Sequence, residues 1–279
     1  MSEIKLVLKS DGTTEPFNGS KLKNSLTSAD ASVVLANEIT DKIKRKLSGV
    51  TSTEDIYNLA FKLLKKTKKR TAARYSMKRS LLDMGPTGFP FEKFIAKIFD
   101  VKNYQTIVGM MLGGSCTEHE VDVIAGDEDD LLLCEVKFHN DIRTKTDTKV
   151  ALYVKARYDD LSNKEYSLFN RRMKPTKGLI ITNTRFTTSA EKYAKCVGLG
   201  MISWDYPKKG NLYDLIEETN LQPITSLISL TKNDKKRLIM ENIIDCRDLL
   251  NNKKVLYSLG LNNKKTEKII IEAKEVCSN

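Results

Sequence analysis

The sequence LLCEVKF, at residues 132–138, places Glu135 and Lys137 two positions apart within an apolar run. Because side chains alternate between the two faces of a β-strand, these two are expected on one face and their apolar neighbours on the other. An earlier run, EVDVI at residues 120–124, carries Asp122. The segment between the runs contains a glycine and a series of acidic residues, which predicts a hairpin turn. Such a hairpin would bring Asp122 beside Glu135.

Two carboxylates and one ammonium group are therefore expected at one place on a sheet. Carboxylate oxygens suit Mg²⁺, which normally keeps several waters and also accepts phosphate oxygens as ligands. The ammonium group of Lys137 could then steady an attacking water or the charge on a scissile phosphate. A Glu-x-Lys tripeptide alone more often marks a solvated face or an ion pair. The two spaced carboxylates, the apolar strand and the order of the elements favour the site.

Length and charge indicate a protein of two or three domains with a polyanionic partner. The 279 residues are enough to bury a real core. The formal net charge of +11 is typical of a protein that binds a polyanion. Positive charge is concentrated in residues 1–80 and 225–279, whereas residues 81–224, which carry the carboxylates, are slightly negative.

The cysteine pattern and the absence of apolar segments predict a cytoplasmic protein without a membrane-bound part. Five cysteines without a Cys-x-x-Cys pair fit reduced thiols better than a disulfide framework. The first residues lack a signal-peptide layout, and no apolar run approaches the roughly 20 residues of a membrane helix. The chain has only two histidines, His119 and His139, which argues against zinc clusters and against histidine-dependent nucleophilic sites.

Periodicity divides the chain into three predicted domains, at residues 1–83, 84–224 and 225–279. The first is expected to be a small β-hairpin followed by helices. One of these helices has a start signal of the Ser/Thr-x-x-Glu type, formed by Thr51 and Glu54. The last domain is expected to be helical and basic.

The middle domain is predicted to follow a linker and to belong to the α/β class. The linker is assigned to residues 83–90, which contain two glycines and two prolines. The expected order is αβββαβ with an αβ extension, giving a mixed sheet with helices on both sides. The predicted elements outside the hairpin are a helix at 91–99, a strand at 104–112, a helix at 146–161, a strand at 178–182, a helix at 188–197 and a strand at 199–204.

Several motifs of the middle domain occur together in one order. They are Phe91-Glu92, residues 120–124, Glu135-Val136-Lys137, Ala151-Leu152-Tyr153 and Thr182-Asn183-Thr184. In this order they resemble the Mrr-like restriction endonucleases of the PD-(D/E)XK superfamily, with Val121 in place of the proline. The resemblance implies that Asp122 and Glu135 bind the metal, that Lys137 is catalytic, and that Glu92 supports the metal from the neighbouring helix.

The first domain carries a different set of motifs, which extends over about residues 3–82. They are VLKSDG at residues 7–12, Glu15-Pro16-Phe17, Lys21, and AARY at residues 72–75 followed by Arg79. Together they resemble an ATP-cone, the small nucleotide-binding module of ribonucleotide reductases and their regulators.

The ATP-cone resemblance implies that ATP or dATP binds between the hairpin and the first helix. The residues implied to contact the nucleotide are Val7, Lys9, Glu15 and Lys21, and the two lysines match the phosphate side. Ser10 stands where a basic residue is usual. Because the chain has no Gly-x-x-x-x-Gly-Lys-Ser/Thr loop, nucleotide sensing is expected rather than hydrolysis.

Two basic segments have alternative interpretations. Residues 62–79 carry nine basic residues and no acidic one, which is typical of a solvated face but could also follow a phosphate backbone. The alternative for the first domain is thus a basic helical domain without a ligand. Residues 259–262 weakly resemble a helix-hairpin-helix, with Asn262 replacing a glycine at a turn that favours left-handed backbone. A helical cap on the middle domain is the alternative there.

The combined prediction is a Mg²⁺-dependent DNA endonuclease of restriction type, regulated by ATP or dATP. Cleavage of both strands of double-stranded DNA requires two sites, so a homodimer or larger homo-oligomer is expected. The first alternative is a non-catalytic, nucleotide-responsive DNA-binding regulator. The second is a resolvase or repair nuclease on the same fold that recognises DNA shape.

Overall fold

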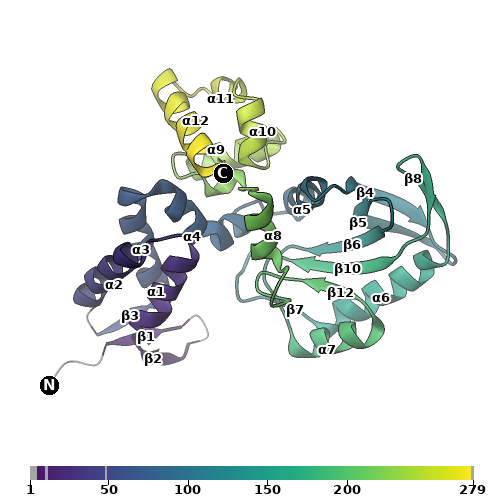
Figure 1. Ribbon diagram of the computed structural model, residues 1–279, viewed down its shortest axis with the longest axis horizontal. Helices are drawn as coiled ribbons and strands as arrows, with labels where there is room; N and C mark the ends of the chain where they lie inside the picture. The colour runs from purple at the N-terminus through teal and green to yellow at the C-terminus, as the bar shows by residue number, and fades with distance from the viewer. Residues whose placement is uncertain (1–4, 10–11, 48, 278–279) are drawn as a thin grey trace.

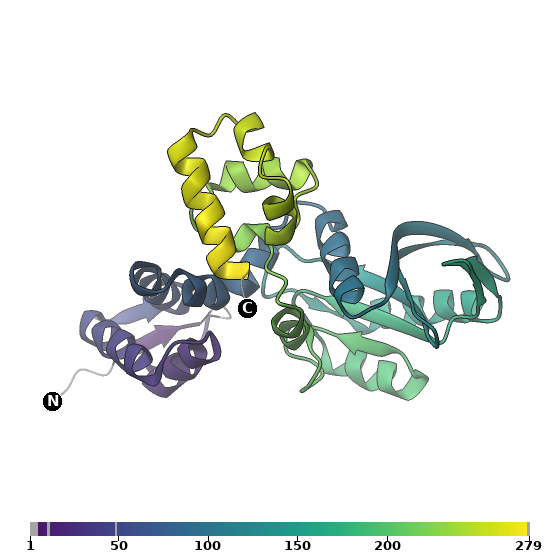
Figure 2. The same cartoon turned by 45° about the horizontal axis from the view of Figure 1, so that its top comes forward.

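Three parts of the chain meet around one helix, α4 (Lys69–Leu82), in the computed structural model (Figure 1). The structure describes residues 5–9, 12–47 and 49–277. The N-terminal part lies on one side of α4, and a larger sheet with its helices lies on the other. The C-terminal helices pack beside both, as the tilted view in Figure 2 also shows.

A small sheet covered by helices forms the N-terminal part. Strand β1 (Leu6–Leu8) pairs antiparallel with β2 (Thr14–Pro16) and parallel with β3 (Val50–Ser52). The helices that follow β2 and β3 are α1 (Gly19–Ser28), α2 (Val33–Lys46) and α3 (Thr53–Thr67). Their apolar faces enclose a core that includes Leu26 and Ile43.

The predicted hairpin of the N-terminal part is confirmed, but two local details differ. Strand β3 was not predicted, and it places the backbone of Thr51 beside that of Val7. The start of α3 is therefore capped one residue later, by Ser52, whose hydroxyl accepts the Asp55 N–H at 3.0 Å. The predicted pair of Thr51 and Glu54 is wrong because Thr51 belongs to the strand. Ser10 lies outside the described residues.

The middle part is a mixed sheet with the strand order β12–β10–β6–β5–β4. Neighbours in the β6–β5–β4 part run antiparallel, whereas β6, β10 and β12 run parallel. The strands are β4 (Gln105–Gly113), β5 (Glu118–Gly126), β6 (Leu131–Lys137), β10 (Lys177–Thr182) and β12 (Gly200–Ile202). The mixed sheet and the predicted hairpin between residues 124 and 131 are confirmed.

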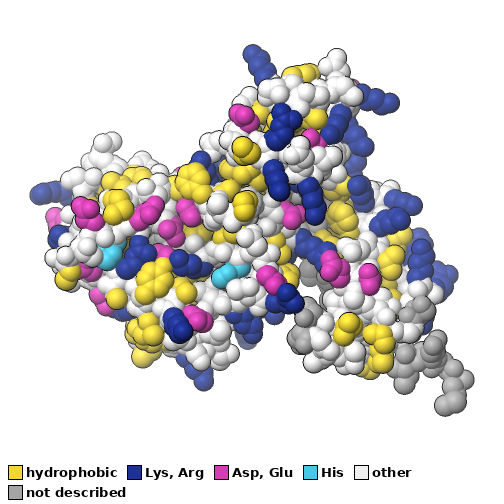
Figure 3. All heavy atoms as spheres, turned by 180° about the vertical axis from the view of Figure 1, so that it is seen from behind, with side chains coloured by type: hydrophobic (Ala, Val, Ile, Leu, Met, Phe, Trp, Pro, Cys, Tyr) yellow, Lys and Arg dark blue, Asp and Glu magenta, His cyan; other side chains and the backbone are white. Residues whose placement is uncertain are grey.

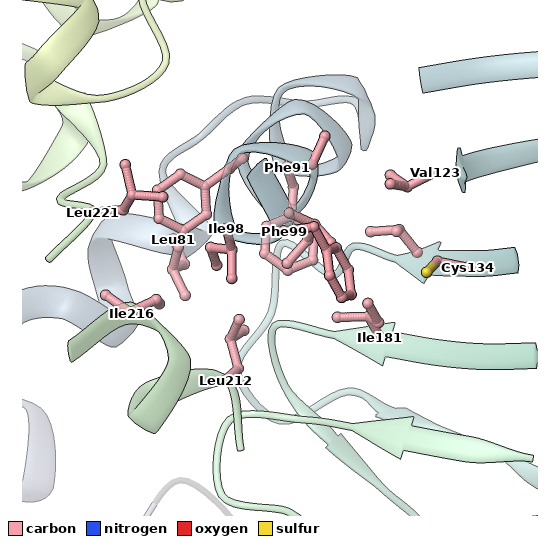
Figure 4. Close-up of a cluster of buried hydrophobic side chains, with 14 of the residues drawn as sticks. Leu81, Phe91, Ile98, Phe99, Val123, Cys134, Ile181, Leu212, Ile216 and Leu221 are labelled. Atoms are coloured by element: carbon pink, nitrogen blue, oxygen red, sulfur yellow. The ribbon is translucent and has the colours of Figure 1, made fainter. Parts of the chain in front are cut away.

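Helices cover both faces of this sheet, as the sequence predicted. Helix α5 (Phe89–Val101) packs on one face, where its Phe91 and Phe99 meet Val123, Cys134 and Ile181 (Figure 4). Helices α6 (Thr148–Ser162) and α7 (Thr188–Val197) pack on the other face, in a core that includes Ile180. The side chains of β10 alternate between these two cores, and those of β6 alternate between the α5 core and a further core that includes Leu133 and Leu161. Burial on both faces is why the sequences of these strands are almost wholly apolar.

Several short elements of the middle part were not predicted. Helix α5 begins at Phe89 rather than at 91, because Pro90 suits the first turn of a helix, so the linker ends at Gly88. The other additions are β7 (Lys145–Thr146), which pairs with β11 (Arg185–Phe186), and β8 (Tyr166–Leu168), which pairs with β9 (Arg171–Met173).

The C-terminal part is helical, as predicted, and follows α8 (Leu212–Thr219). Its elements are η1 (Ile224–Ser226), α9 (Lys232–Met240), α10 (Cys246–Asn251), α11 (Val255–Ser258) and α12 (Asn263–Cys277). The left-handed residue between α11 and α12 is Gly260, with φ of 75°. Asn262 accepts the Lys265 N–H at 2.9 Å instead, so the left-handed role expected for Asn262 is wrong.

Helix α4 contributes side chains to all three cores. Ala72 packs in the N-terminal core, Ala73 in the C-terminal core, and Met77 and Leu81 in the core beneath α5. A helix buried on several sides has no single apolar stripe. The periodicity of this segment therefore did not indicate that α4 lies between the three parts. Helix α4 therefore takes part in the packing of all three parts.

The basic residues of α4 lie in contacts between the three parts rather than on an open face. Arg74 forms ion pairs with Asp30 at 3.5 Å and with Glu217 of α8 at 3.0 Å. Arg79 lies 3.6 Å from the ring centroid of Tyr57. The expectation of a solvated face is therefore wrong for the α4 part of residues 62–79, whereas contact with a phosphate backbone stays a prediction.

Candidate functional site

The predicted carboxylates and lysine converge where the β5–β6 ladder ends. Paired residues of this ladder stop at Val123 and Cys134. One position further, the Asp122 side chain replaces the backbone pairing, because its Oδ2 accepts the Val136 N–H at 2.7 Å. Val136 lies between Glu135 and Lys137, so all three predicted side chains meet at one point of β6.

The neighbouring strand β4 is also distorted opposite Asp122. Its ladder with β5 passes from the pair Val108–Val123 to the pair Met110–Val121 and omits Gly109. Gly109 has φ of 65°, a left-handed conformation that strains any residue with a Cβ. Regular pairing is therefore interrupted on both sides of Asp122, which leaves its carboxylate beside the strand edge instead of within a continuous sheet.

Glu135 is almost fully enclosed by cations and donors from β6 and α6. Its side chain lies next to Lys137, with Nζ 2.5 Å from Oε1, and next to Arg157, with Nη1 2.8 Å from Oε2. The Tyr153 hydroxyl also donates to Oε1. Only 7% of Glu135 is exposed. The partners on α6 were not predicted as a cluster, although Tyr153 belongs to one of the sequence motifs.

Glu92 of α5 faces the same cluster and carries an unusually high pKa. Burial, followed by the negative charges of Asp122, Glu120 and Glu135, raises its pKa to about 7 against the opposing effect of Lys137. Burial and the Glu135 charge likewise raise the pKa of Asp122 to about 6. Two neighbouring carboxyl groups that resist ionisation indicate a place where a further positive charge would be stabilised.

The donor set fits a Mg²⁺ ion that is held by few protein ligands. The Val136 N–H donates to Oδ2 of Asp122, and no described residue donates a hydrogen bond to Oδ1. This second oxygen is therefore available to a metal ion beside Glu92 and Glu135. Within residues 5–9, 12–47 and 49–277, no three His, Cys, Asp or Glu side chains are arranged to hold a metal by themselves. Mg²⁺ normally needs only one or two carboxylates, with water and phosphate oxygens completing its shell.

The polar residues after β10 serve to fix the end of β6. Asn183 accepts the His139 N–H at 2.9 Å and donates to the His139 carbonyl at 2.8 Å. The His139 ring contacts the Thr146 hydroxyl at 3.0 Å, and burial followed by the Lys137 charge lowers its pKa. Arg185, which follows these polar residues, pairs with Asp205 at 2.7 Å.

All four residues implied to contact a nucleotide line one pocket of about 460 Å³ in the N-terminal part. Glu15 lies between the two lysines, 2.8 Å from Lys9 Nζ and 2.9 Å from Lys21 Nζ. These contacts lower the pKa of Glu15. Val7 adds an apolar wall. The pocket therefore joins an apolar interior to a pair of ammonium groups that are currently held by one carboxylate.

Aromatic side chains from α3 and α4 also line this pocket: Tyr75 belongs to a motif that the sequence identified, whereas Tyr57 was not predicted. The Tyr57 and Tyr75 rings are stacked at 5.1 Å, and the Arg79 guanidinium lies over Tyr57. Burial raises the pKa of Tyr75 to about 12, so it stays a neutral phenol. A planar apolar wall and paired lysines in one pocket suit a base and its phosphates. Tyr57 and Phe61 stand four positions apart in the sequence, and this aromatic pair on one helix face was the signal from which Tyr57 could have been found.

Comparison with known proteins bears on the two ends of the chain. Residues 5–84 match the model of the ATP cone domain, so an ATP-cone is present at the N-terminus. Such domains bind nucleotides such as ATP or dATP as regulators. Residues 223–277 match the model described as AF1548-like, C-terminal.

Relatives that are matched over almost their whole length identify the family of this chain. An uncharacterised protein from Archaeoglobus fulgidus is 33% identical over 183 residues, which is 65% of this chain and 99% of the relative. The chain belongs to the AF1548-like family. The crystal structure titled protein of unknown function AF1548 is 31% identical, with a TM-score of 0.55, covering 68% of this chain and 98% of that one. Protein VC1899 from Vibrio cholerae is similar at a TM-score of 0.30 and 15% identity, over 72% of this chain and 51% of that one, which supports no argument.

Two further findings concern the expected partners. This member of the AF1548-like family has an ATP-cone, which indicates nucleotide-responsive regulation. Among the described residues, none of the helices combines the length and the apolar character that crossing a membrane requires.

A second pocket, of about 310 Å³, adjoins the ATP-cone pocket at the junction with the sheet. Ser25 and Tyr75 line both pockets. Trp204 and Tyr213 line the second pocket from the sheet side, and the Tyr213 hydroxyl donates to the Ser28 carbonyl at 2.7 Å. The wall of the ATP-cone pocket is thus also a wall of the junction between the ATP-cone and the sheet.

Trp204 fluorescence is expected to titrate with a midpoint near pH 8. Burial, followed by the Arg185 charge, lowers the pKa of Lys78 to about 8 against the opposing effect of Asp205. Lys78 Nζ lies 5.6 Å from the Trp204 ring centroid. A lysine with a depressed pKa destabilises the fold while charged, and this cost is relieved as the pH rises from about 8 toward its ordinary value. Trp204 is the only tryptophan, so emission reports this site alone.

The matched variants for this titration are Lys78→Met and Lys68→Met. Lys78→Met should abolish the transition near pH 8, whereas Lys68→Met, an exposed position just before α4, should leave it unchanged. A transition of unchanged size in Lys78→Met would show that another group is responsible.

Proposed function

We propose that residues 84–224 form a PD-(D/E)XK nuclease core and that the chain is a Mg²⁺-dependent DNA endonuclease of restriction type. The observation that carries this proposal is the convergence of Asp122, Glu135 and Lys137 at the end of β6, with Lys137 Nζ 2.5 Å from Glu135 and Asp122 2.7 Å from the intervening backbone N–H. Two carboxylates with a lysine at a strand end suit hydrolysis of a phosphodiester.

The side chains around the cluster have separable roles in this proposal. Glu135 and the Tyr153 ring, 5.4 Å from Lys137 Nζ, hold the ammonium group in place. Because the Lys137 side chain is 32% exposed, its charge can meet a phosphate and stabilise the developing negative charge. Asp122 and Glu135 would hold Mg²⁺, with Glu92 as support, and the ion would supply a Lewis acid for the scissile phosphate.

The surface charge supports DNA as the substrate. The net charge is +11, and Figure 3 shows Lys and Arg side chains gathered over the C-terminal helices. Cations distributed over a face attract the phosphate backbone without regard to sequence. Cleavage of both strands needs two centres, so we propose that the active form is a homodimer or larger homo-oligomer. ATP or dATP would act through the ATP-cone.

One observation favours a second candidate, a non-catalytic nucleotide-responsive DNA-binding regulator. Both carboxylate oxygens of Glu135 are already engaged, by Lys137 and Tyr153 at Oε1 and by Arg157 at Oε2. A protein that never binds the ion could keep this arrangement permanently. Salt-dependent DNA binding without cleavage in the presence of several divalent ions would support the regulator.

Asp122→Asn is expected to raise thermal stability in EDTA and to abolish the stabilisation that Mg²⁺ gives the wild type. The folded-state pKa of Asp122, about 6, lies above its ordinary value of 3.8, so ionisation destabilises the fold as the pH rises through this interval. At pH 8 in EDTA the neutral amide should therefore raise the Tm. Saturation with Mg²⁺ at about ten times Kd should raise the wild-type Tm by roughly 2–4 °C and leave the variant unchanged.

The matched control for this measurement is Asp129→Asn, in the exposed turn between β5 and β6. It should behave as wild type in both buffers. A Mg²⁺-dependent rise in Tm of equal size in Asp122→Asn would place the ion elsewhere and remove the proposed metal ligand.

A further inference from the structure

A pocket of about 450 Å³ lies between the segment that leads into α5 and the C-terminal helices. Its volume is in the roughly 300–1,000 Å³ range of small-ligand sites. The walls are apolar and come from Met84, Pro86, Phe89, Ile239, Met240 and Ile244. Phe89 and Met240 at this pocket are 49% and 84% exposed, so a large apolar area is offered to a ligand.

The charge at this pocket is positive and is not neutralised. Lys93 and Lys236 line the pocket, whereas no Asp or Glu does. Neither lysine forms an ion pair with any residue that the structure describes. By contrast Lys97, one helical turn beyond Lys93, is paired with Asp245 at 3.1 Å and with Asp248. These two ammonium groups, which no carboxylate of the described residues neutralises, make the pocket suited to an anionic ligand.

The polar groups of the pocket are arranged around the Phe89 ring. Lys93 Nζ lies 4.3 Å from the ring centroid and 2.7 Å from Asn242 Oδ1. Asn242 has a left-handed backbone, with φ of 62°, which turns its amide into the contact with Lys93. An aromatic face, an amide and two cations are thus available within one apolar pocket.

The segment that leads into α5 separates this pocket from the carboxylate cluster. An added Cβ on Gly88 would lie 3.2 Å from Glu92 Oε1 and 3.6 Å from Phe138 Cβ. The Asn140 amide contacts the Pro86 carbonyl at 3.5 Å, and Pro86 itself lines the pocket. A strand of nucleic acid that reached Glu92 would therefore pass close to the pocket mouth.

We propose that this pocket receives an unpaired nucleobase, with its phosphate, from the DNA strand bound at the carboxylate cluster. Aromatic stacking beside lysines is the combination that single-stranded nucleic-acid sites use. Phe89 would stack on the base, Lys93 and Lys236 would contact the phosphate, and the Asn242 amide would meet the base edge. The assignment rests on the proposed nuclease function, because DNA is the source of the base.

The test compares two labelled DNA duplexes by fluorescence anisotropy in EDTA, one fully paired and one with a single unpaired adenine. Wild type should bind the unpaired duplex more tightly. Phe89→Ala should weaken binding of this duplex about tenfold, as expected for loss of one base–aromatic stack, and weaken the paired duplex less than twofold. Lys93→Gln should act in the same direction. Tyr257→Ala, an exposed aromatic on α11 outside the pocket, should match wild type.

The outcomes separate this inference from the proposed function. Equal wild-type affinity for the two duplexes, or an equal loss on both in Phe89→Ala, would overturn the base pocket while leaving DNA cleavage intact. Absence of DNA binding altogether would instead remove the nuclease proposal as well. A parallel titration with dAMP distinguishes the source of the base: Phe89-dependent binding of dAMP as tight as that of the duplex would assign the pocket to a free nucleotide and overturn the DNA assignment.

Discussion

Lys137→Met is expected to reduce Mg²⁺-dependent nicking of a supercoiled plasmid by at least about 100-fold. Removal of one preorganised group that stabilises transition-state charge commonly costs on the order of 100- to 1,000-fold in rate. Methionine keeps the apolar part of the side chain next to Tyr153 and removes only the ammonium group. The measurement is the initial rate of loss of supercoiled plasmid on a gel, with and without ATP.

The control for this loss is Lys155→Met, which removes a lysine that lies between Tyr153 and Arg157 in the sequence. Lys155 is on α6 and pairs with Asp159 one turn away, so it does not contact Glu135. It should retain the wild-type rate. Equal nicking by wild type and Lys137→Met would show that the observed cleavage does not arise at the assigned site, and salt-dependent binding would then favour the regulator.

The pairing of Asp122 with the Glu135 strand could be predicted because it depends on local rules. Alternation along a strand fixes which face Glu135 and Lys137 share, and a short acidic turn fixes the hairpin that returns Asp122 to them. The enclosure of Glu135 could not be predicted in the same way. It depends on how α6 docks on the sheet, which places Tyr153 and Arg157 on the carboxylate.

The arrangement of the three parts was also beyond local rules. The strand β3 is short, and pairing with β1 rather than its own composition makes it a strand. The position of α4 between three cores depends on long-range packing, so its arginines looked like surface residues in the sequence. The pocket at Phe89 is formed by segments about 150 positions apart, whose proximity no periodicity reports.

Lys21→Ala is expected to weaken ATP and dATP binding by about 10- to 100-fold, measured by isothermal titration calorimetry. Each hydrogen bond to a charged group contributes about 1.5–3 kcal/mol, and Lys21 is one of two ammonium groups at the phosphate side of the ATP-cone pocket. Lys23→Ala is the matched control on the same helix, because Lys23 does not line the pocket. Equal losses in both variants would indicate a general charge effect instead of a phosphate contact.

Glu15→Gln should act in the opposite direction and strengthen nucleotide binding. In the structure its carboxylate forms ion pairs with both Lys9 and Lys21, so a triphosphate must displace the carboxylate and overcome its negative charge. The amide removes both obstacles. Trp204 emission, followed in the same titrations, reports whether nucleotide binding in the ATP-cone pocket changes the environment of Trp204 in the adjoining pocket, which shares Ser25 and Tyr75. Weaker binding in Glu15→Gln would instead make this carboxylate part of the nucleotide site, positioning the two lysines that the phosphates require.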